Sequence, residues 1–319
     1  MRTRLMALPS SSDWPSLPIN LLDSILDYLV PMEDYLTFSE VCIEWHYAVR
    51  GKLQHLRSNR KRHCRLHQQV PLLMAPLAGN PRDRCCLYDV MKGKSLWEVQ
   101  LRLLGRWRCE GSSHGWLILV AEDSYKVVLL NPFSGKLIHL PSLENPIFVE
   151  ISGPTWIIGT QSLNKCSYPY NRRRCVLSND PDVNSDEFVL MMTCGSFVPS
   201  LVFIKSGEEY WTYIKELRDV RDICYSNGLF YVLDGWGVLV SCDVSNHSKV
   251  RMITWPVNKF VFVSYLVESP EGDLLRVIKH EGGFVIYKLQ WFSKNPRWEE
   301  VMSFGRCCLV FGRQSLHFC

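Results

Sequence analysis

Apolar side chains recur at helical spacing near the start of the chain. Between residues 17 and 29, leucine and isoleucine recur at intervals of three and four, and Asp23, Ser24 and Asp27 lie on the other face. This pattern predicts an amphipathic helix. Pro18 suits the first turn of that helix, where a missing N–H costs nothing, and Pro31 ends it.

Two further helices follow in the same pattern. The second is predicted from Asp34 to Ser39, with Asp34 near its cap. The third begins near Val41 and carries Trp45, Val49, Leu53 and Leu56. Residues 13–57 are therefore predicted to form a small all-α domain with three helices.

The next 25 residues change in character. Residues 58–82 are first basic and then contain Pro71, Pro76, Gly79 and Pro81. Such a segment favours a linker without regular structure.

From about Cys85 onward, the pattern becomes that of β-strands. Short apolar runs alternate with Gly, Asn, Asp and Pro, as in residues 116–120, 126–130, 136–140, 228–233, 237–240, 272–277 and 284–287. Gly228 and Gly272 begin similar units 44 residues apart, close to the roughly 40–50 residues of a four-stranded propeller blade. This spacing favours an all-β, propeller-like domain over residues 83–319. A β-sandwich or an irregular barrel would give similar strand spacing and stays open as an alternative.

The predicted fold class is thus α+β and multidomain: an all-α N-terminal domain, then an all-β repeat domain. Composition agrees with this, because 47% of residues are hydrophobic and 12% are aromatic. The net charge of +4 is small for the length, which argues against a nucleic-acid partner. No apolar run approaches the roughly 18 residues of a membrane span, and the N-terminus lacks a signal-peptide core. Thirteen cysteines, an odd number without such a signal, are typical of buried reduced thiols in the cytoplasm or nucleus.

One motif of catalytic type is present. Gly111-Ser112-Ser113-His114-Gly115 matches the Gly-x-Ser-x-Gly nucleophile elbow, which requires a helix after the serine. A predicted strand follows instead, so we interpret the glycines as a turn within the β domain. An enzyme on a propeller scaffold would need ionisable groups converging at the central channel, and the sequence reveals no such set.

Metal and cofactor sites are not predicted. His63, Cys64 and His67 lie close together, and Cys85-Cys86 and Cys307-Cys308 are adjacent pairs. None has the Cys-x-x-Cys spacing of a zinc site. The phosphate-binding glycine loops of nucleotide-binding proteins are also missing from the sequence.

The sequence contains two basic runs, of which the first could form a contact surface for acidic groups. The run from Arg50 to Arg65 has no acidic residue and could serve as a nuclear localisation signal, although we favour the solvated end of the third helix and a linker. The second run, Arg172-Arg173-Arg174, is predicted to lie in an exposed loop.

The N-terminal segment resembles the F-box motif. Trp14 to Pro18, the ladder Leu21-Leu22, Ile25-Leu26 and Leu29, the triplet Asp34-Tyr35-Leu36, and finally Val41, Cys42 and Trp45 follow the family order over about 40 residues. His46 stands where the family often has arginine. So short a module buries little core by itself, and its apolar residues imply a partner.

The resemblance implies what that partner is. In F-box proteins it is a Skp-type adaptor that links to a cullin. By this resemblance, the residues that form or support the docking surface are Leu17, Pro18, Ile25, Leu26, Val41, Cys42 and Trp45. The sequence does not separate those that touch the adaptor from those that pack the module.

The rest of the chain resembles a plant group of F-box proteins with a propeller-like, kelch-resembling C-terminal domain. The matching phrases are residues 115–117, 130–135, 138–141, 227–233 and 298–301. Such relatives continue past the stretch that resembles residues 303–312 with more strand-forming sequence, whereas this chain ends at Cys319. We therefore expect a β domain that is incomplete or closed in another way.

The resemblance implies a non-catalytic substrate receptor of a Skp–cullin–F-box ubiquitin ligase, with an unknown target protein and no nucleic-acid or membrane partner. Two alternatives remain: an F-box-containing binding protein without a degradation role, including a truncated family member, and an enzyme on a propeller scaffold.

Overall fold

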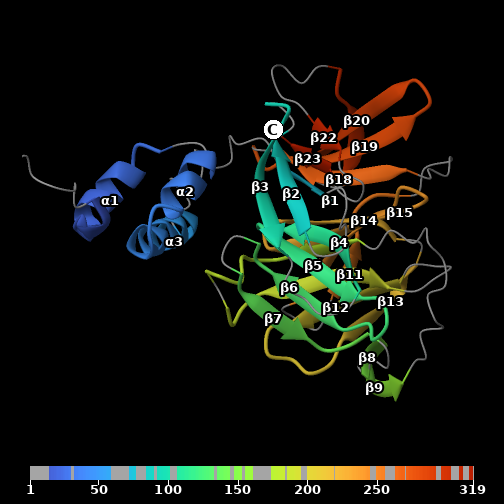
Figure 1. Cartoon of the computed structure of the whole chain (residues 1–319). Coiled ribbons are helices and arrows are strands. Elements are labelled where there is room, and N and C mark those ends of the chain that lie inside the picture. The colour runs from blue at the N-terminus through green and yellow to red at the C-terminus, as the bar shows by residue number, and fades with distance from the viewer. Residues whose placement is uncertain are drawn as a thin grey trace, which may run out of the picture. The chain divides into compact units, whose positions relative to one another are not determined.

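The computed structural model describes most of the helical and β regions of the chain. The described residues are 14–29, 32–58, 72–76, 84–89, 92–100, 106–132, 135–143, 147–152, 155–160, 174–183, 185–194, 200–218, 220–244, 249–255, 263–269, 271–291, 296–302, 309–311 and 316–318. The chain divides into two compact units, residues 1–70 and residues 71–319. Figure 1 shows both units with most of their elements labelled.

The first unit contains the three predicted helices. Its elements are η1 (Trp14–Ser16), α1 (Ile19–Leu26), α2 (Met32–Ser39) and α3 (Ile43–Ser58). Pro18 immediately precedes α1 as its N-cap instead of lying within its first turn. In this position too, proline costs the helix no hydrogen bond, because the N–H groups at a helix start have no partner within the helix.

The second unit begins with a three-stranded antiparallel sheet of β1 (Leu72–Pro76), β2 (Arg84–Asp89) and β3 (Lys94–Gln100). Strand β1 lies within the segment for which the sequence predicted no regular structure. Its five residues pair with β2, from Leu72 opposite Asp89 to Pro76 opposite Cys85. The sequence pattern does not predict this strand, because its short apolar run is bounded by prolines. Pro76 is tolerated because it lies at the end of a strand at the edge of its sheet.

The second sheet is a four-stranded antiparallel meander. It contains β4 (Trp107–Ser113), β5 (Trp116–Ala121), β6 (Val127–Leu130) and β7 (Leu137–Leu140). The last three strands lie where the sequence predicted them. A two-residue turn joins β4 to β5, with His114 and Gly115 at φ 52° and 79°, which suits the twist of a β-hairpin.

The third sheet begins with a four-stranded meander of the same kind. It contains β10 (Cys175–Leu177), β11 (Val189–Cys194), β12 (Ser200–Lys205) and β13 (Thr212–Arg218). The hairpin of β8 (Ile147–Ser152) and β9 (Thr155–Thr160) extends it, because β8 pairs in parallel with β13.

The fourth and fifth sheets repeat the meander. The fourth contains β14 (Val220–Ser226), β15 (Leu229–Asp234), β16 (Leu239–Asp243) and β17 (Lys249–Met252). The fifth contains β18 (Ser264–Glu268), β19 (Leu274–His280), β20 (Gly283–Gln290) and β21 (Arg297–Glu300). Gly228 and Gly272 each lie in the turn after the first strand of their sheet. The 44-residue spacing seen in the sequence is therefore the step from one sheet to the next.

A final hairpin pairs β22 (Leu309–Phe311) with β23 (Leu316–Phe318). Strand β23 lies beside β18, the first strand of the fifth sheet.

The sheets neighbour one another through their first strands. Strand β10 lies beside β4 and β14, and β14 lies beside β18. A series of meanders joined in this way is the arrangement of β-propeller blades. The five sheets of three or more strands among the described residues correspond to five blades, which confirms the propeller prediction over the sandwich and the irregular barrel.

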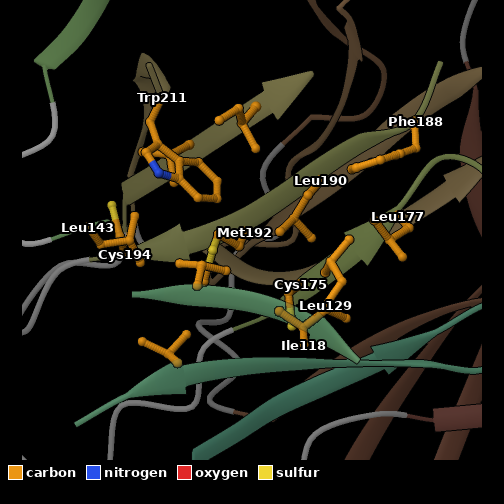
Figure 2. Packing of buried hydrophobic residues seen from close by; sticks show 14 of the residues in the cluster. Ile118, Leu129, Leu143, Cys175, Leu177, Phe188, Leu190, Met192, Cys194 and Trp211 are labelled. Atoms are coloured by element: carbon orange, nitrogen blue, oxygen red, sulfur yellow. The ribbon is translucent and has the colours of Figure 1, made fainter. Parts of the chain in front are cut away.

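The largest apolar core lies between the second and third blades. Ile118 and Leu129 of the second blade face Leu190 and Met192 of the third (Figure 2). All four side chains are fully buried, and burying each one contributes about 1.5–3 kcal/mol. The blades are thus held together mainly by the faces that they present to one another.

Candidate functional site

The helical unit is organised around Trp45 of α3. The indole ring of Trp45 stacks on Phe38 of α2 with 4.2 Å between ring centroids. Its Nε1 donates a hydrogen bond to the carbonyl oxygen of Trp14 at 3.2 Å, so it also ties η1 to the unit. On the other side of the unit, the Tyr35 hydroxyl donates to the carbonyl oxygen of Leu26 at 2.8 Å, which joins α2 to α1.

Lys52 corrects one interpretation of the basic run. Its side chain is buried against α1, where Nζ lies 3.0 Å from Asp27 Oδ1 and donates to the carbonyl oxygen of Asp23 at 3.4 Å. Lys52 therefore links α3 to α1 and is not part of a solvated face. The side chains of the other basic residues of the run lie outside the described set.

The seven residues predicted to form or support the docking surface differ widely in exposure. Leu26 and Trp45 are buried, with 0% and 8% of their surface exposed. Ile25 and Val41 are 37% and 52% exposed, and Pro18 is also exposed. The surface of the free unit therefore presents these last three, while Leu26 and Trp45 support it from within.

Leu17 and Cys42 are intermediate. Both are partly buried and pack against the core of the helical unit. Because both are only partly buried, they can contribute to a surface and to the core at once.

The sequence prediction missed several exposed apolar residues of this unit. They are Trp14, Ile19, Leu21, Tyr28, Ile43 and Tyr47. The eight-residue helix α1 buries only Leu22 and Leu26, so its remaining apolar residues face outward. Exposed large apolar residues at this density mark an interaction surface.

A second candidate site is a cavity of about 260 Å³ at the first strands of four blades. Its walls come from β4, β10, β14 and β18 together with the residues next to them. Three acidic residues and one arginine lie among the lining, namely Glu110, Asp222, Glu268 and Arg174. The sequence analysis found no such set, and the structure corrects that conclusion.

Arg174 and Asp222 form a buried pair beside the cavity. Arg174 Nε lies 3.4 Å from Asp222 Oδ1 and donates to the carbonyl oxygen of Arg221 at 3.0 Å. Burial raises the pKa of Asp222 to about 6, and the Arg174 charge and two backbone N–H donors oppose this rise. The sequence placed Arg174 in an exposed loop, which is wrong: the side chain is buried, and its guanidinium lies 5.3 Å from the centre of the Tyr265 ring.

The other two carboxylates differ in their partners. Buried Glu110 accepts a hydrogen bond from Arg108 Nε at 2.7 Å, so a cation compensates its charge. Glu268 accepts a hydrogen bond from the Ser226 hydroxyl at 2.7 Å. Ser226 is a neutral donor, so it leaves the charge of Glu268 in place.

The thiols near the cavity are poor nucleophiles. Burial raises the pKa of Cys109 to about 11, against a smaller lowering by a backbone hydrogen bond with Gly111. Burial, with the charges of Asp222 and Glu268, raises the pKa of Cys224 far above its ordinary value. Because the thiolate is the reactive form, both groups are inert near neutral pH.

The Gly-x-Ser-x-Gly stretch is a hairpin, as the sequence analysis interpreted it. Ser113 ends β4, and β5 follows after two residues where a nucleophile elbow requires a helix. The Ser113 hydroxyl oxygen accepts a hydrogen bond from the Leu177 N–H at 3.1 Å, which joins the second blade to the third. The serine therefore has a structural role here.

Three cysteine and histidine groups were considered as metal ligands from the sequence. Cys85 and Cys86 lie in β2, Cys85 buried and Cys86 partly buried, and both are free thiols. His63, Cys64, His67 and the pair Cys307-Cys308 lie outside the described residues.

Among the helices of the described part of the chain, none combines the length and the apolar character of a membrane span.

Comparison with known sequences identifies two matching families. The profile of the KIB1-4 beta-propeller matches residues 87–319, and that of the F-box domain matches residues 14–56. Two relatives from Arabidopsis thaliana align along nearly the whole chain. The probable F-box protein At4g22060 is 22% identical and covers 93% of this chain and 78% of its own length. The F-box/kelch-repeat protein At1g57790 is 25% identical and covers 96% of this chain and 78% of its own length.

Among solved structures, one in the complex of KlAtg21 with the coiled-coil of AgAtg16 aligns over 78% of this chain and 74% of that chain. The TM-score is 0.45 and the sequence identity is 9%.

Proposed function

Because this chain belongs to the KIB1-4 beta-propeller family and carries an F-box ahead of its propeller, we propose that it is the substrate receptor of a Skp–cullin–F-box ubiquitin ligase. The combination of F-box and propeller is that of a substrate-receptor type protein, and it is typical of non-catalytic adaptors. In this proposal, the F-box binds a Skp-type adaptor and, through it, a cullin. The propeller binds a target protein.

One observation carries the proposal: the F-box unit exposes apolar residues around a small packed core. Ile25 on α1 and Val41 before α3 are both exposed although they are β-branched and apolar. A unit of this size leaves such residues uncovered when another protein covers them in its working state.

The mechanism is proximity. The F-box holds one end of the chain on the ligase scaffold, and the propeller holds the target at high effective concentration near the ubiquitin carrier. The chain contributes binding and orientation, and the covalent chemistry belongs to the other subunits. Such a complex would act in the cytoplasm or the nucleus.

The test is binding of the full-length chain to a purified Skp-type adaptor by isothermal titration calorimetry. We expect the wild type to bind. A variant with Pro18→Ala, Ile25→Glu and Val41→Glu should bind at least about tenfold more weakly, because it buries two charges in the apolar interface. Its helical circular dichroism should remain, since all three residues are exposed.

Met302→Glu is the matched control, because Met302 is an exposed apolar residue of the propeller unit. It should bind the adaptor like the wild type. If a well-folded wild type fails to bind any Skp-type adaptor, the proposal is wrong. If the triple variant binds as tightly as the wild type, the surface has been assigned to the wrong residues.

A reconstituted ubiquitination assay distinguishes a ligase receptor from an F-box-containing binding protein without a degradation role. Adaptor binding together with ubiquitin transfer to a bound target supports a ligase receptor. Adaptor binding without transfer to any bound protein would instead indicate an F-box-containing binding protein with no degradation role.

A further inference from the structure

The cavity at the first strands of the propeller blades has the size of a single side chain. Its volume is about 260 Å³, below the roughly 300–1,000 Å³ of pockets that enclose a drug-sized molecule. A long side chain of a bound protein or a small polar group fits this space better than a cofactor.

The charges of the lining are unbalanced. Glu110 pairs with Arg108 at 2.7 Å and Asp222 pairs with Arg174 at 3.4 Å. Glu268 accepts only the neutral Ser226 hydroxyl, and no cation within the described residues forms an ion pair with it. Within the described part of the chain, one carboxylate at the cavity is therefore left without a counter-ion.

The position of Glu268 favours a cation as its partner. The carboxylate is partly buried, so water screens it less than it would on an open surface. Because the other two carboxylates of the lining are paired with arginines, Glu268 gives the cavity a net negative charge, which makes an anionic ligand unfavourable. A positive charge placed beside Glu268 would gain a charge-assisted hydrogen bond of the stronger kind.

The remaining walls suit an aliphatic stem. Val176, Ile223 and Val267 also line the cavity. Lysine and arginine carry an apolar stem beneath a charged head, so apolar walls with a single carboxylate match both parts of these side chains.

We infer that this cavity receives one basic side chain of the target protein, with Glu268 as its counter-ion. The inference deepens the proposed function and rests on it for the identity of the ligand as part of a target. The chemistry shared by the two candidate ligands is a cation on an aliphatic stem, carried as an ammonium or as a guanidinium.

The test titrates the full-length chain with three blocked amino acids, followed by NMR. N-acetyl-lysine methylamide and N-acetyl-arginine methylamide are the probes, and N-acetyl-norleucine methylamide is the neutral control of similar shape. We expect saturable binding of at least one cationic probe and none of the norleucine control, and the tighter cation identifies the preferred head group.

Glu268→Gln is the decisive variant, because it removes the charge and keeps an acceptor for the Ser226 hydroxyl. Binding of the cationic probe should weaken at least about tenfold, the usual minimum effect of removing one partner of a partly buried charged pair. Glu300→Gln, at an exposed glutamate of β21, is the matched control and should bind as the wild type does.

Three results would overturn the inference. The norleucine probe could bind as tightly as the cationic probes, the cationic probe could bind Glu268→Gln as tightly as the wild type, or neither cationic probe could bind. Should Glu268→Gln fail to fold, the comparison of charged and neutral probes on the wild type still decides. Adaptor binding is measured on the same samples. If the cations bind and the adaptor does not, the cavity is a cation site and the assignment of its ligand to a ligase target is wrong.

Discussion

Arg174 Nε lies 3.4 Å from Asp222 Oδ1, and this pair joins the third blade to the fourth. The other carboxylate oxygen, Asp222 Oδ2, accepts a hydrogen bond from the Leu266 N–H of the fifth blade at 2.8 Å. One buried carboxylate thus connects three consecutive blades at the edge of the cavity. Removing one partner of such a pair leaves an uncompensated buried charge, so we expect both residues to matter for folding.

Asp222 predicts a specific dependence of stability on pH. Its pKa rises from 3.8 to about 6 on folding, so the folded state binds the proton more tightly than the unfolded state. The stability that this proton contributes is present below about pH 4 and is lost as the pH rises through 6. Relative to Asp222→Asn, the wild type should lose about 2 kcal/mol of unfolding free energy between pH 4 and pH 7.

The measurement is urea unfolding of the β domain at several pH values for both proteins. Asp186→Asn, at an exposed aspartate, serves as the baseline for removing one carboxylate. A difference between wild type and Asp222→Asn that is constant with pH would contradict the raised pKa. A difference of opposite slope would mean that the attraction of Arg174 outweighs burial.

Gly111 predicts a steric effect. A Cβ atom at this position would lie 2.6 Å from the Sγ atom of Cys175, across the boundary between the second and third blades. Gly111→Ala should therefore cost about 1–3 kcal/mol of unfolding free energy. Adding Cys175→Ala should recover part of that loss, and a double-mutant cycle of thermal or urea unfolding measures the coupling.

Gly282→Ala is the matched control for this steric effect, because nothing lies within 4 Å of its Cβ position. It should change stability by no more than about 0.5 kcal/mol. Strictly additive effects of Gly111→Ala and Cys175→Ala would show that the strain is relieved elsewhere.

The F-box unit predicts opposite results for two adjacent residues of α1. Leu26 is fully buried, so Leu26→Ala should cost about 2–5 kcal/mol, a large part of what so small a unit can have. Ile25 is 37% exposed, so Ile25→Ala should stay within about 1 kcal/mol of the wild type. Limited proteolysis and circular dichroism at 222 nm measure both, and equal sensitivity of the two variants would contradict the burial seen here.

The contact between the second and third blades can be tested at Trp116. Its Nε1 donates a hydrogen bond to Asp180 Oδ1 at 2.9 Å, from a side chain that is fully buried. Trp116→Phe keeps an aromatic ring but removes the donor, so it should cost about 2–4 kcal/mol from the lost charged hydrogen bond and the smaller ring. Trp255→Phe, at an exposed tryptophan, should have little effect in the same urea titration.

Much of the local structure could be predicted because its causes are local. The leucine and isoleucine spacing before Pro31 is enough for α1, and the pairs His114-Gly115 and Asn227-Gly228 mark two hairpins by their turn chemistry. Strand β1 was missed because its short apolar run stands between prolines. It becomes a strand through pairing with β2, which no local pattern reveals.

The cavity residues could not be predicted from the sequence. Glu110, Arg174, Asp222 and Glu268 are each separated by more than 40 positions, and nothing in their immediate surroundings relates them. A charged residue in or next to the first strand of a blade was the available signal. Arg174 shows its limit, because a run of three arginines suggests a solvated loop until a buried partner is known.

The sequence by itself determined the helices of the F-box, the hairpins of the propeller and the step from one blade to the next, since periodicity and turn residues act over a few positions. Only the tertiary structure decided which apolar residues of the F-box are core and which are surface, because a helix of eight residues can bury only one side. It also decided that four distant ionisable residues share one cavity, because the packing of neighbouring blades, and not any local preference, brings their first strands together.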